Sequence, residues 1–112
     1  MKILRRHFNN LFEQELNRAK RDSKSICLIM LDVDMFKLYN DNYGHQKGDF
    51  ALQEVAKVLK AHARRAGDFA FRLGGEEFGV ILTSSDYEQS LQVAESIHLN
   101  IEKSAIELWL LL

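Results

Sequence analysis

The stretch "RLGGEEFGV", residues 72–80, places two glycines and two glutamates between two strand-like runs, residues 69–73 and 78–82. Paired glycines between runs rich in Phe, Val and Ile are typical of a β-hairpin. A neutral Asn-Gly turn would serve the backbone equally well, and adjacent carboxylates repel each other. The two glutamates therefore predict a positive group close to the tip of the hairpin.

Apolar periodicity predicts three amphipathic helices, over residues 4–19, 45–65 and 85–108. The continuous apolar run at residues 26–31 predicts a strand buried on both faces. This strand leads into "DVDMF" and then into "NDNYG", whose composition is typical of a turn. These assignments give one helix, one strand, a second helix, a hairpin and a third helix.

The order of these elements after the first helix is strand, helix, strand, strand, helix. This is a split βαβ, ferredoxin-like unit that lacks its last strand. Its third strand lies antiparallel between the first and second, so we expect Asp32 and Asp34 to lie beside Glu76 and Glu77. The predicted fold class is α+β, an α/β sandwich with helices packed on an antiparallel sheet. The missing strand would leave the first strand with an unpaired edge, open to a neighbouring chain.

Ser85 and Glu88 have the spacing of a capping box at the start of the third helix. The third helix is therefore expected to begin directly after Ser85.

Composition indicates a single globular domain over residues 1–112, with 46% hydrophobic and 28% charged residues. A net charge of −1 gives no basic field for nucleic acid or an anionic membrane. The lone Cys27 lies in "ICLIML" and is expected to pack as a small apolar side chain. No apolar run is long enough for a membrane segment, and no signal peptide is present, so we expect a cytoplasmic protein.

Asp32, Glu76 and Glu77 together would form an all-oxygen site. Hard oxygen ligands suit Mg²⁺ or Mn²⁺, and no His or Cys cluster suggests zinc. Glycines at the turn can adopt positive φ and let a bulky anion approach the backbone. The alternative is a plain hairpin with a solvated acidic tip.

Two segments carry a family resemblance: "LDVDMFKLYNDNYGHQKGD", residues 31–49, and "RAGDFAFRLGGEEF", residues 65–78. They resemble the GGDEF family of diguanylate cyclases, whose fixed positions in D-x-D-x-F-K-x-x-N-D-x-x-G-H-x-x-G-D, R-x-x-D and R-x-G-G-[DE]-E-F are all present. The resemblance implies a palm-type nucleotidyl cyclase sheet, cut short at the C-terminal strand and helix. It also implies condensation of two GTP molecules into cyclic di-GMP by a homodimer, with release of pyrophosphate. The family's leading D-x-L-T-G-L-x-N-R-R segment survives only as "ILRRHF".

The resemblance implies metal ligands in Asp32, the Val33 carbonyl and Glu76. Glu76 would also be the candidate base for the ribose hydroxyl, and Glu77 would share either task. Lys37 would face the triphosphate.

For the substrate pocket, the resemblance implies that Asn40 and Asp49 hydrogen-bond guanine and that Phe36 and His45 complete the pocket. A carboxylate that accepts from the guanine amino and ring N–H groups favours GTP over ATP. Each of these residues taken alone would be an ordinary surface or helix residue, and it is their joint spacing that points to a nucleotide site.

Arg65 and Asp68 match the R-x-x-D motif that binds the product cyclic di-GMP and inhibits the enzyme in many family members. The alternative is a helix-terminal arginine followed by a Gly-Asp turn. For the whole chain, the alternatives are a module that binds GTP or cyclic di-GMP without turnover, and a purely structural dimerisation domain.

Overall fold

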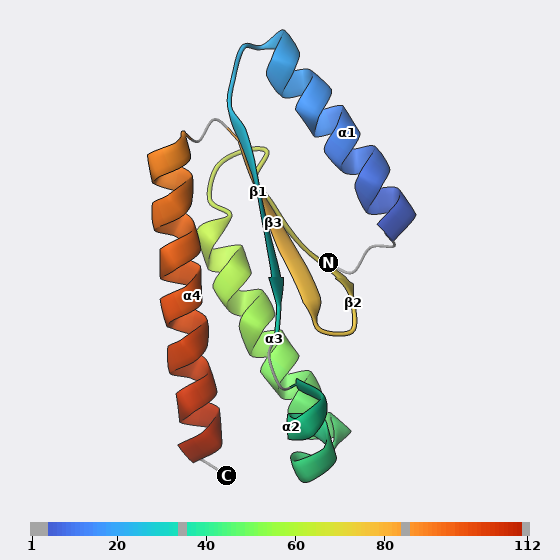
Figure 1. Ribbon diagram of the computed structural model, residues 1–112, viewed down its shortest axis with the longest axis vertical. Coiled ribbons are helices and arrows are strands. Elements are labelled where there is room, and N and C mark those ends of the chain that lie inside the picture. Colours follow the sequence, from blue (N-terminus) through green and yellow to red (C-terminus); the bar gives the residue numbers. More distant parts are fainter. Residues whose placement is uncertain (1–4, 34–35, 84–85, 111–112) are drawn as a thin grey trace.

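The computed structural model describes residues 5–33, 36–83 and 86–110, with residues 104–110 described by their backbone alone. Figure 1 shows the elements in chain order. They are α1 (Arg5–Arg21), β1 (Ile26–Asp32), α2 (Phe36–Tyr43), α3 (His45–His62), β2 (Phe69–Gly74), β3 (Glu77–Thr83) and α4 (Tyr87–Leu110). In this part of the chain, no helix is both long and apolar enough to cross a membrane.

The three strands form one antiparallel sheet in the order β1-β3-β2. The register of β1 on β3 runs from Ile26 opposite Thr83 to Asp32 opposite Glu77. The α+β fold class and the central position of the hairpin's second strand are thereby confirmed. The carboxyl end of β1 and the start of β3 lie at the same end of the sheet.

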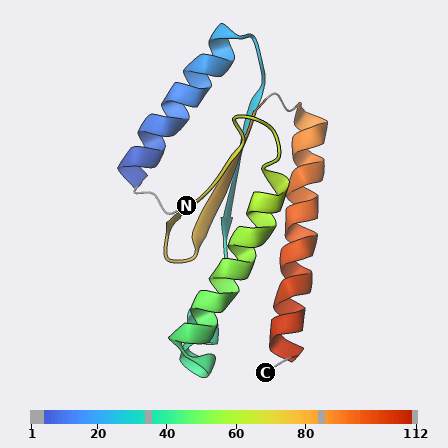
Figure 2. The ribbon, with the colours of Figure 1, turned by 180° about the vertical axis from the view of Figure 1, so that it is seen from behind.

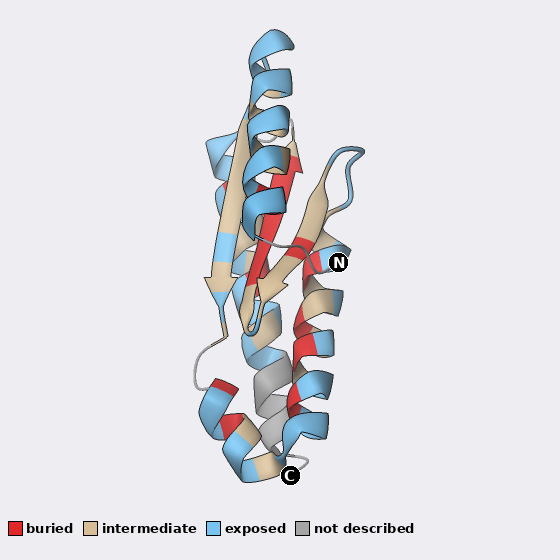
Figure 3. Cartoon of the chain, turned by 90° about the vertical axis from the view of Figure 1, so that its right-hand side faces the viewer, coloured by how far each residue is buried: buried red, intermediate tan, exposed pale blue. Residues whose placement is uncertain are grey.

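The sheet separates two apolar layers. α3 and α4 lie side by side on one face, and α1 packs on the other face (Figures 1 and 2). Because side chains alternate along a strand, Val80 and Leu82 of β3 point to α3 and α4 while Ile81 points to α1. Phe8 anchors α1 through its ring, whose centroid is 4.7 Å from that of Phe71. β3 is the most deeply buried strand, as the red central strand in Figure 3 shows.

The prediction that β1 is buried on both faces was wrong. Its residues are half-buried, and Met30 and Asp32 are exposed. Within the described residues β1 pairs only with β3, so solvent reaches its other edge. Its apolar character is explained by contacts on both faces, with Ile29 on the α3 and α4 side and Leu28 on the α1 side.

α2 is a helix where the sequence predicted a turn. Phe36 and Tyr39, three residues apart, are its buried residues, so one face is packed and the other is solvated. A helix this short is stabilised by tertiary packing rather than by its own propensity, which explains why local composition did not reveal it. Burial, and after it the neighbouring Tyr43 phenol, raises the pKa of Tyr39. Gly44, at φ +90°, separates α2 from α3.

The capping box of α4 lies one residue later than predicted, and Ser85 falls outside the described residues. The Asp86 carboxylate accepts from the Gln89 N–H at 2.8 Å, and the Asp86 N–H donates to the Gln89 side-chain oxygen at 3.2 Å. This reciprocal pair fixes the start of the helix at Tyr87.

Ile81 is fully buried at the centre of the middle strand, so Ile81→Ala should lower the free energy of unfolding by about 2–5 kcal/mol. Leu91→Ala, on the exposed face of α4, is the matched control and should change it by less than about 0.5 kcal/mol. Urea denaturation followed by circular dichroism measures both. Equal effects would contradict the assigned core.

Candidate functional site

The end of β1 and the turn of the hairpin form one acidic corner. Asp32 lies directly opposite Glu77, and the Val33 N–H donates to the Glu76 carbonyl at 3.1 Å. The structure therefore places the backbone positions of Asp32, Glu76 and Glu77 at one end of the sheet, as expected from the strand order. Asp34 lies outside the described residues.

The turn itself depends on two glycines in positive φ, Gly74 at +132° and Gly75 at +52°. No atom would crowd a Cβ at either position, so the backbone conformation rather than close packing favours glycine there. Arg72 braces the turn, because its Nε donates to the Gly75 carbonyl at 2.8 Å. The glutamates are thus held on a defined turn.

The positive group expected near the glutamates is Arg5, the first residue of α1. Its Nη2 donates to both carboxylate oxygens of Glu77, each at 2.8 Å. No sequence pattern singled out Arg5 as the partner of Glu77. The signal was the unbalanced charge of the hairpin tip, but no periodicity relates two residues that lie 72 positions apart.

The acidic corner supplies oxygen donors of the kind that Mg²⁺ prefers: the carboxylates of Asp32 and Glu76 and the carbonyl of Val33. Within the described ranges, no group of three or more His, Cys, Asp or Glu side chains is gathered closely enough to hold a metal ion. Mg²⁺ commonly takes one or two protein carboxylates and completes its shell with water and substrate phosphate. The donor chemistry therefore fits this ion, and the individual ligand roles remain predictions.

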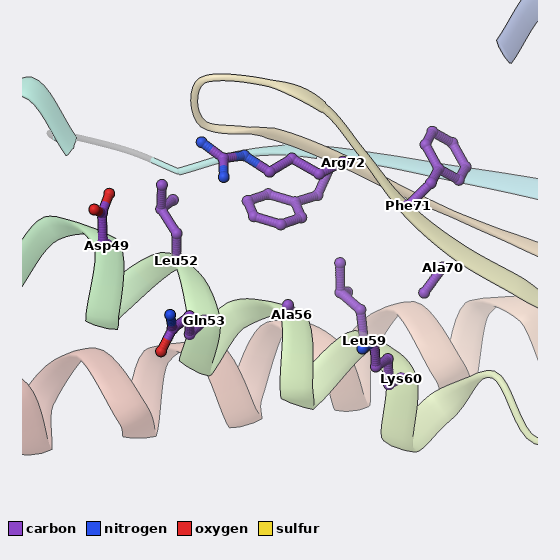
Figure 4. A pocket seen from close by; sticks show the side chains of 10 residues that line it. Asp49, Leu52, Gln53, Ala56, Leu59, Lys60, Ala70, Phe71 and Arg72 are labelled. Carbon is purple, nitrogen blue, oxygen red and sulfur yellow. The ribbon is translucent and has the colours of Figure 1, made fainter. Parts of the chain in front are cut away.

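A pocket of about 380 Å³ lies between α3 and β2, on the side of the sheet away from α1 (Figure 4). Asp49 lies at the end of this pocket nearest the hairpin turn, and the Arg72 guanidinium lies 5.9 Å from the centre of the Phe78 ring. The lining residues are Asp49, Leu52, Gln53, Ala56, Leu59, Lys60, Ala70, Phe71, Arg72 and Phe78. Of the four residues predicted to bind substrate, Asp49 alone lines this pocket.

Asn40 of α2 packs against Gly48 of α3, the residue before Asp49. A Cβ at Gly48 would overlap the side-chain oxygen of Asn40 and would crowd the Phe36 ring at 3.3 Å. The Asn40 oxygen is buried against Gly48 and accepts no hydrogen bond from any described residue. The missing Cβ of Gly48 thus lets Asn40 approach the turn of α3 that carries Asp49.

The remaining predicted substrate and phosphate residues differ in burial. Phe36 is only 8% exposed and belongs to the core cluster that includes Leu52 of α3, so it does not line the pocket itself. Lys37 on α2 and His45 at the start of α3 are exposed. Their roles toward a nucleotide remain predictions.

The Arg65–Asp68 segment lies at the far end of β3 from the acidic corner. The Asp68 carboxylate accepts from the Arg65 N–H at 2.9 Å, the Thr83 N–H at 2.8 Å and the Thr83 hydroxyl at 3.1 Å. Arg65 Nη1 lies 3.4 Å from the Thr83 carbonyl oxygen. Asp68 therefore fastens this loop to the end of β3, a structural task that the motif alone did not reveal.

The chain resembles known proteins over most of its length. The family model "Diguanylate cyclase, GGDEF domain" matches residues 4–109. The chain is 39% identical over 106 residues to diguanylate cyclase A of Treponema denticola, which covers 92% of this chain and 28% of that protein. It is 35% identical over 107 residues to diguanylate cyclase DosC of Escherichia coli K12, a match that covers 95% of this chain and 23% of that protein. The chain thus spans about a quarter of the length of these curated relatives.

Solved structures agree with this match. The GGDEF domain of DgcB from Caulobacter crescentus, in complex with c-di-GMP, has a TM-score of 0.76 and 35% identity over 83% of this chain and 54% of that chain. The GGDEF domain of PA1120 (YfiN or TpbB) from Pseudomonas aeruginosa has a TM-score of 0.78 and 29% identity, over 88% of this chain and 61% of that chain. The arrangement of sheet and helices is therefore shared with these domains.

Gly48→Ala should lower the free energy of unfolding. Replacing a glycine inside a helix by alanine ordinarily raises the free energy of unfolding by about 0.5–1 kcal/mol. The added methyl group would displace Asn40 and press on Phe36, at a cost of roughly 1–3 kcal/mol. Thermal denaturation shows whether Gly48→Ala lowers or raises the melting temperature. A rise in the melting temperature would show that α2 does not pack against α3 in this way.

Asp68→Ala should lower the free energy of unfolding by about 1–3 kcal/mol, because it leaves the backbone N–H groups of Thr83 and Arg65 without their acceptor. Arg65→Ala retains the backbone N–H that Asp68 uses and should cost less than about 1 kcal/mol. Chemical denaturation of both variants tests this. Equal losses would contradict the fastening role of Asp68.

Proposed function

Because the chain belongs to the GGDEF diguanylate cyclase family, we propose that it binds GTP and takes part in condensing two GTP molecules into cyclic di-GMP and pyrophosphate. The observation that carries the proposal is the register of β1 on β3, which sets Asp32 opposite Glu77 and ties Val33 to Glu76. We take residues 1–112 as part of one cytoplasmic GGDEF domain.

Guanine recognition falls to Asp49 and Asn40 in this proposal. The Asp49 carboxylate in the pocket can accept from both the ring N–H and the amino group of guanine, a donor pair that adenine lacks. Asn40, packed against Gly48, the residue before Asp49, is proposed to hydrogen-bond the base through its side-chain amide. Phe36 holds Asn40 in place from the core, and His45 starts the helix that carries Asp49. The site would therefore select GTP over ATP.

The phosphate chemistry falls to the acidic corner and to α2. Glu76 is the candidate base that takes the proton of the attacking 3′-hydroxyl. Lys37 contributes a positive charge that lowers the cost of charge building up on departing pyrophosphate. A bound Mg²⁺, held by Asp32, the Val33 carbonyl and Glu76, would supply Lewis-acid stabilisation of the phosphate oxygens. The third member of the acidic corner, Glu77, is held by Arg5.

Two copies of the chain are required. One site holds one GTP, and each 3′-hydroxyl must reach the α-phosphate of the other nucleotide, so two protomers face each other about a two-fold axis. In this proposal the Arg65–Asp68 segment is a second site for the product. Asp68 shapes its loop, and the Arg65 guanidinium offers a planar donor group for phosphate or a guanine edge.

The test is incubation of the purified chain with GTP and Mg²⁺, with products identified by mass spectrometry. Cyclic di-GMP should form with wild type, and Glu76→Gln should reduce its rate by about 10²-fold or more through loss of the base. Glu88→Gln, on the exposed first turn of α4, is the matched control and should retain activity. Equal rates for wild type and Glu76→Gln would contradict the assignment.

Nucleotide titration separates binding from turnover. Asp49→Asn should weaken GTP binding by about 10–100-fold, because it loses a charged acceptor for guanine, and should leave weak ATP binding unchanged. Mg²⁺-dependent GTP binding without product would identify a binding module rather than an enzyme. A folded sample with neither binding nor product would refute the nucleotide site.

A further inference from the structure

The two adjacent glutamates of the hairpin have different surroundings. Both oxygens of Glu77 are engaged by Arg5 Nη2 at 2.8 Å. Glu76 stands in the turn, where its carbonyl accepts from Val33, and no hydrogen bond or ion pair joins its side chain to another described residue. One carboxylate is therefore committed to a protein cation, and the other is available.

Arg5 is placed over the hairpin by the packing of α1. Phe8 lies three residues later on the same face of the helix and is docked against Phe71 of β2. One turn before this anchor, the first residue of α1 reaches the start of β3. The contact thus joins the beginning of the described chain to the signature turn of the family.

Asp32 and Glu77 explain why a positive group is needed there. The bond from Val33 to Glu76 makes Asp32 and Glu77 a non-hydrogen-bonded cross-strand pair, in which side chains lie closest. Both project to the α1 side of the sheet, as Leu28 and Ile81 do further along the same strands. Like charges directly opposite each other are destabilising, and Arg5 offsets one of them.

We propose that Arg5 is a positioning residue that gives Glu76 and Glu77 different roles. It holds Glu77 as the contact between α1 and the hairpin, and it leaves Glu76 with Asp32 as the carboxylate pair for a divalent cation. This inference rests on the proposed function for its metal site. A displacement of the start of α1 would release Glu77 and add one negative charge beside that site.

The simpler reading is a surface ion pair with little energetic effect. The two side chains are 59% and 41% exposed, and pairs this exposed contribute little to stability. The two readings differ in cation affinity rather than in stability, so the test measures Mn²⁺ affinity in the absence of nucleotide.

The first experiment titrates Mn²⁺ by electron paramagnetic resonance into wild type, Arg5→Ala, Glu77→Gln, the double variant and Glu76→Gln. Glu76→Gln should weaken Mn²⁺ binding by about tenfold or more, and Glu77→Gln by less than about twofold. Arg5→Ala should tighten binding by about fivefold, because it frees a carboxylate and removes a positive charge. The double variant should lose this gain.

The matched control is Arg6→Ala, which removes the same charge from the exposed neighbouring residue and should leave Mn²⁺ affinity within about twofold of wild type. Arg5→Lys keeps the charge without the planar group and should fall between wild type and Arg5→Ala. The proposal is overturned if Glu77→Gln weakens Mn²⁺ as much as Glu76→Gln does, or if Arg5→Ala changes nothing.

The second experiment needs no metal. Hydrogen exchange is measured at the amides of residues 9–12, which bond to the first carbonyls of α1. Arg5→Ala and Glu77→Gln should each speed this exchange several-fold, whereas Arg6→Ala should not. Unchanged exchange would overturn the contact itself. Faster exchange in a chain that binds no Mn²⁺ would uphold the contact and refute the proposed metal site.

Discussion

The backbone hydrogen bond from the Val33 N–H to the Glu76 carbonyl closes the antiparallel ladder of β1 on β3, and the candidate site depends on it. It fixes the register in which Asp32 faces Glu77. A slip by one residue would turn the acidic side chains to the opposite face and bring Leu31 in their place. The apolar alternation along β3 opposes such a slip, because Val80 and Leu82 belong to one core layer and Ile81 to the other.

The sheet keeps two parts of the candidate site on opposite faces. Arg5, Glu77 and Asp32 lie on the side of α1, and the pocket that Asp49 lines lies on the side of α3. The hairpin turn is the edge at which the two sides meet, and Arg72 braces it from the pocket side. The pocket and the acidic corner are therefore separated by the hairpin turn.

Much of this arrangement could be predicted from sequence. The strand order and the meeting of Asp32 with the glutamates follow from apolar runs, turn residues and the rules of βαβ topology. α2 could not be predicted in this way, because its helical state depends on the docking of Phe36 and Tyr39 rather than on local composition. The half-burial of β1 was also missed: the strand order predicted an unpaired edge for this strand, but its apolar run was taken as burial on both faces.

The sequence by itself determined the family, the order of the elements and the residue types of an acidic candidate site, because these follow from local pattern and motif spacing. Only the tertiary structure decided three contacts: Arg5 forms an ion pair with Glu77, Asn40 packs against Gly48, and Asp68 binds the end of β3 through hydrogen bonds to Thr83. Each of these contacts joins segments whose relative position is set by tertiary packing: a helix on the sheet, a helix on a helix, and a loop on the end of a strand. Apolar periodicity shows that a helix will dock, but the interlocking of side chains such as Phe8 and Phe71 determines where.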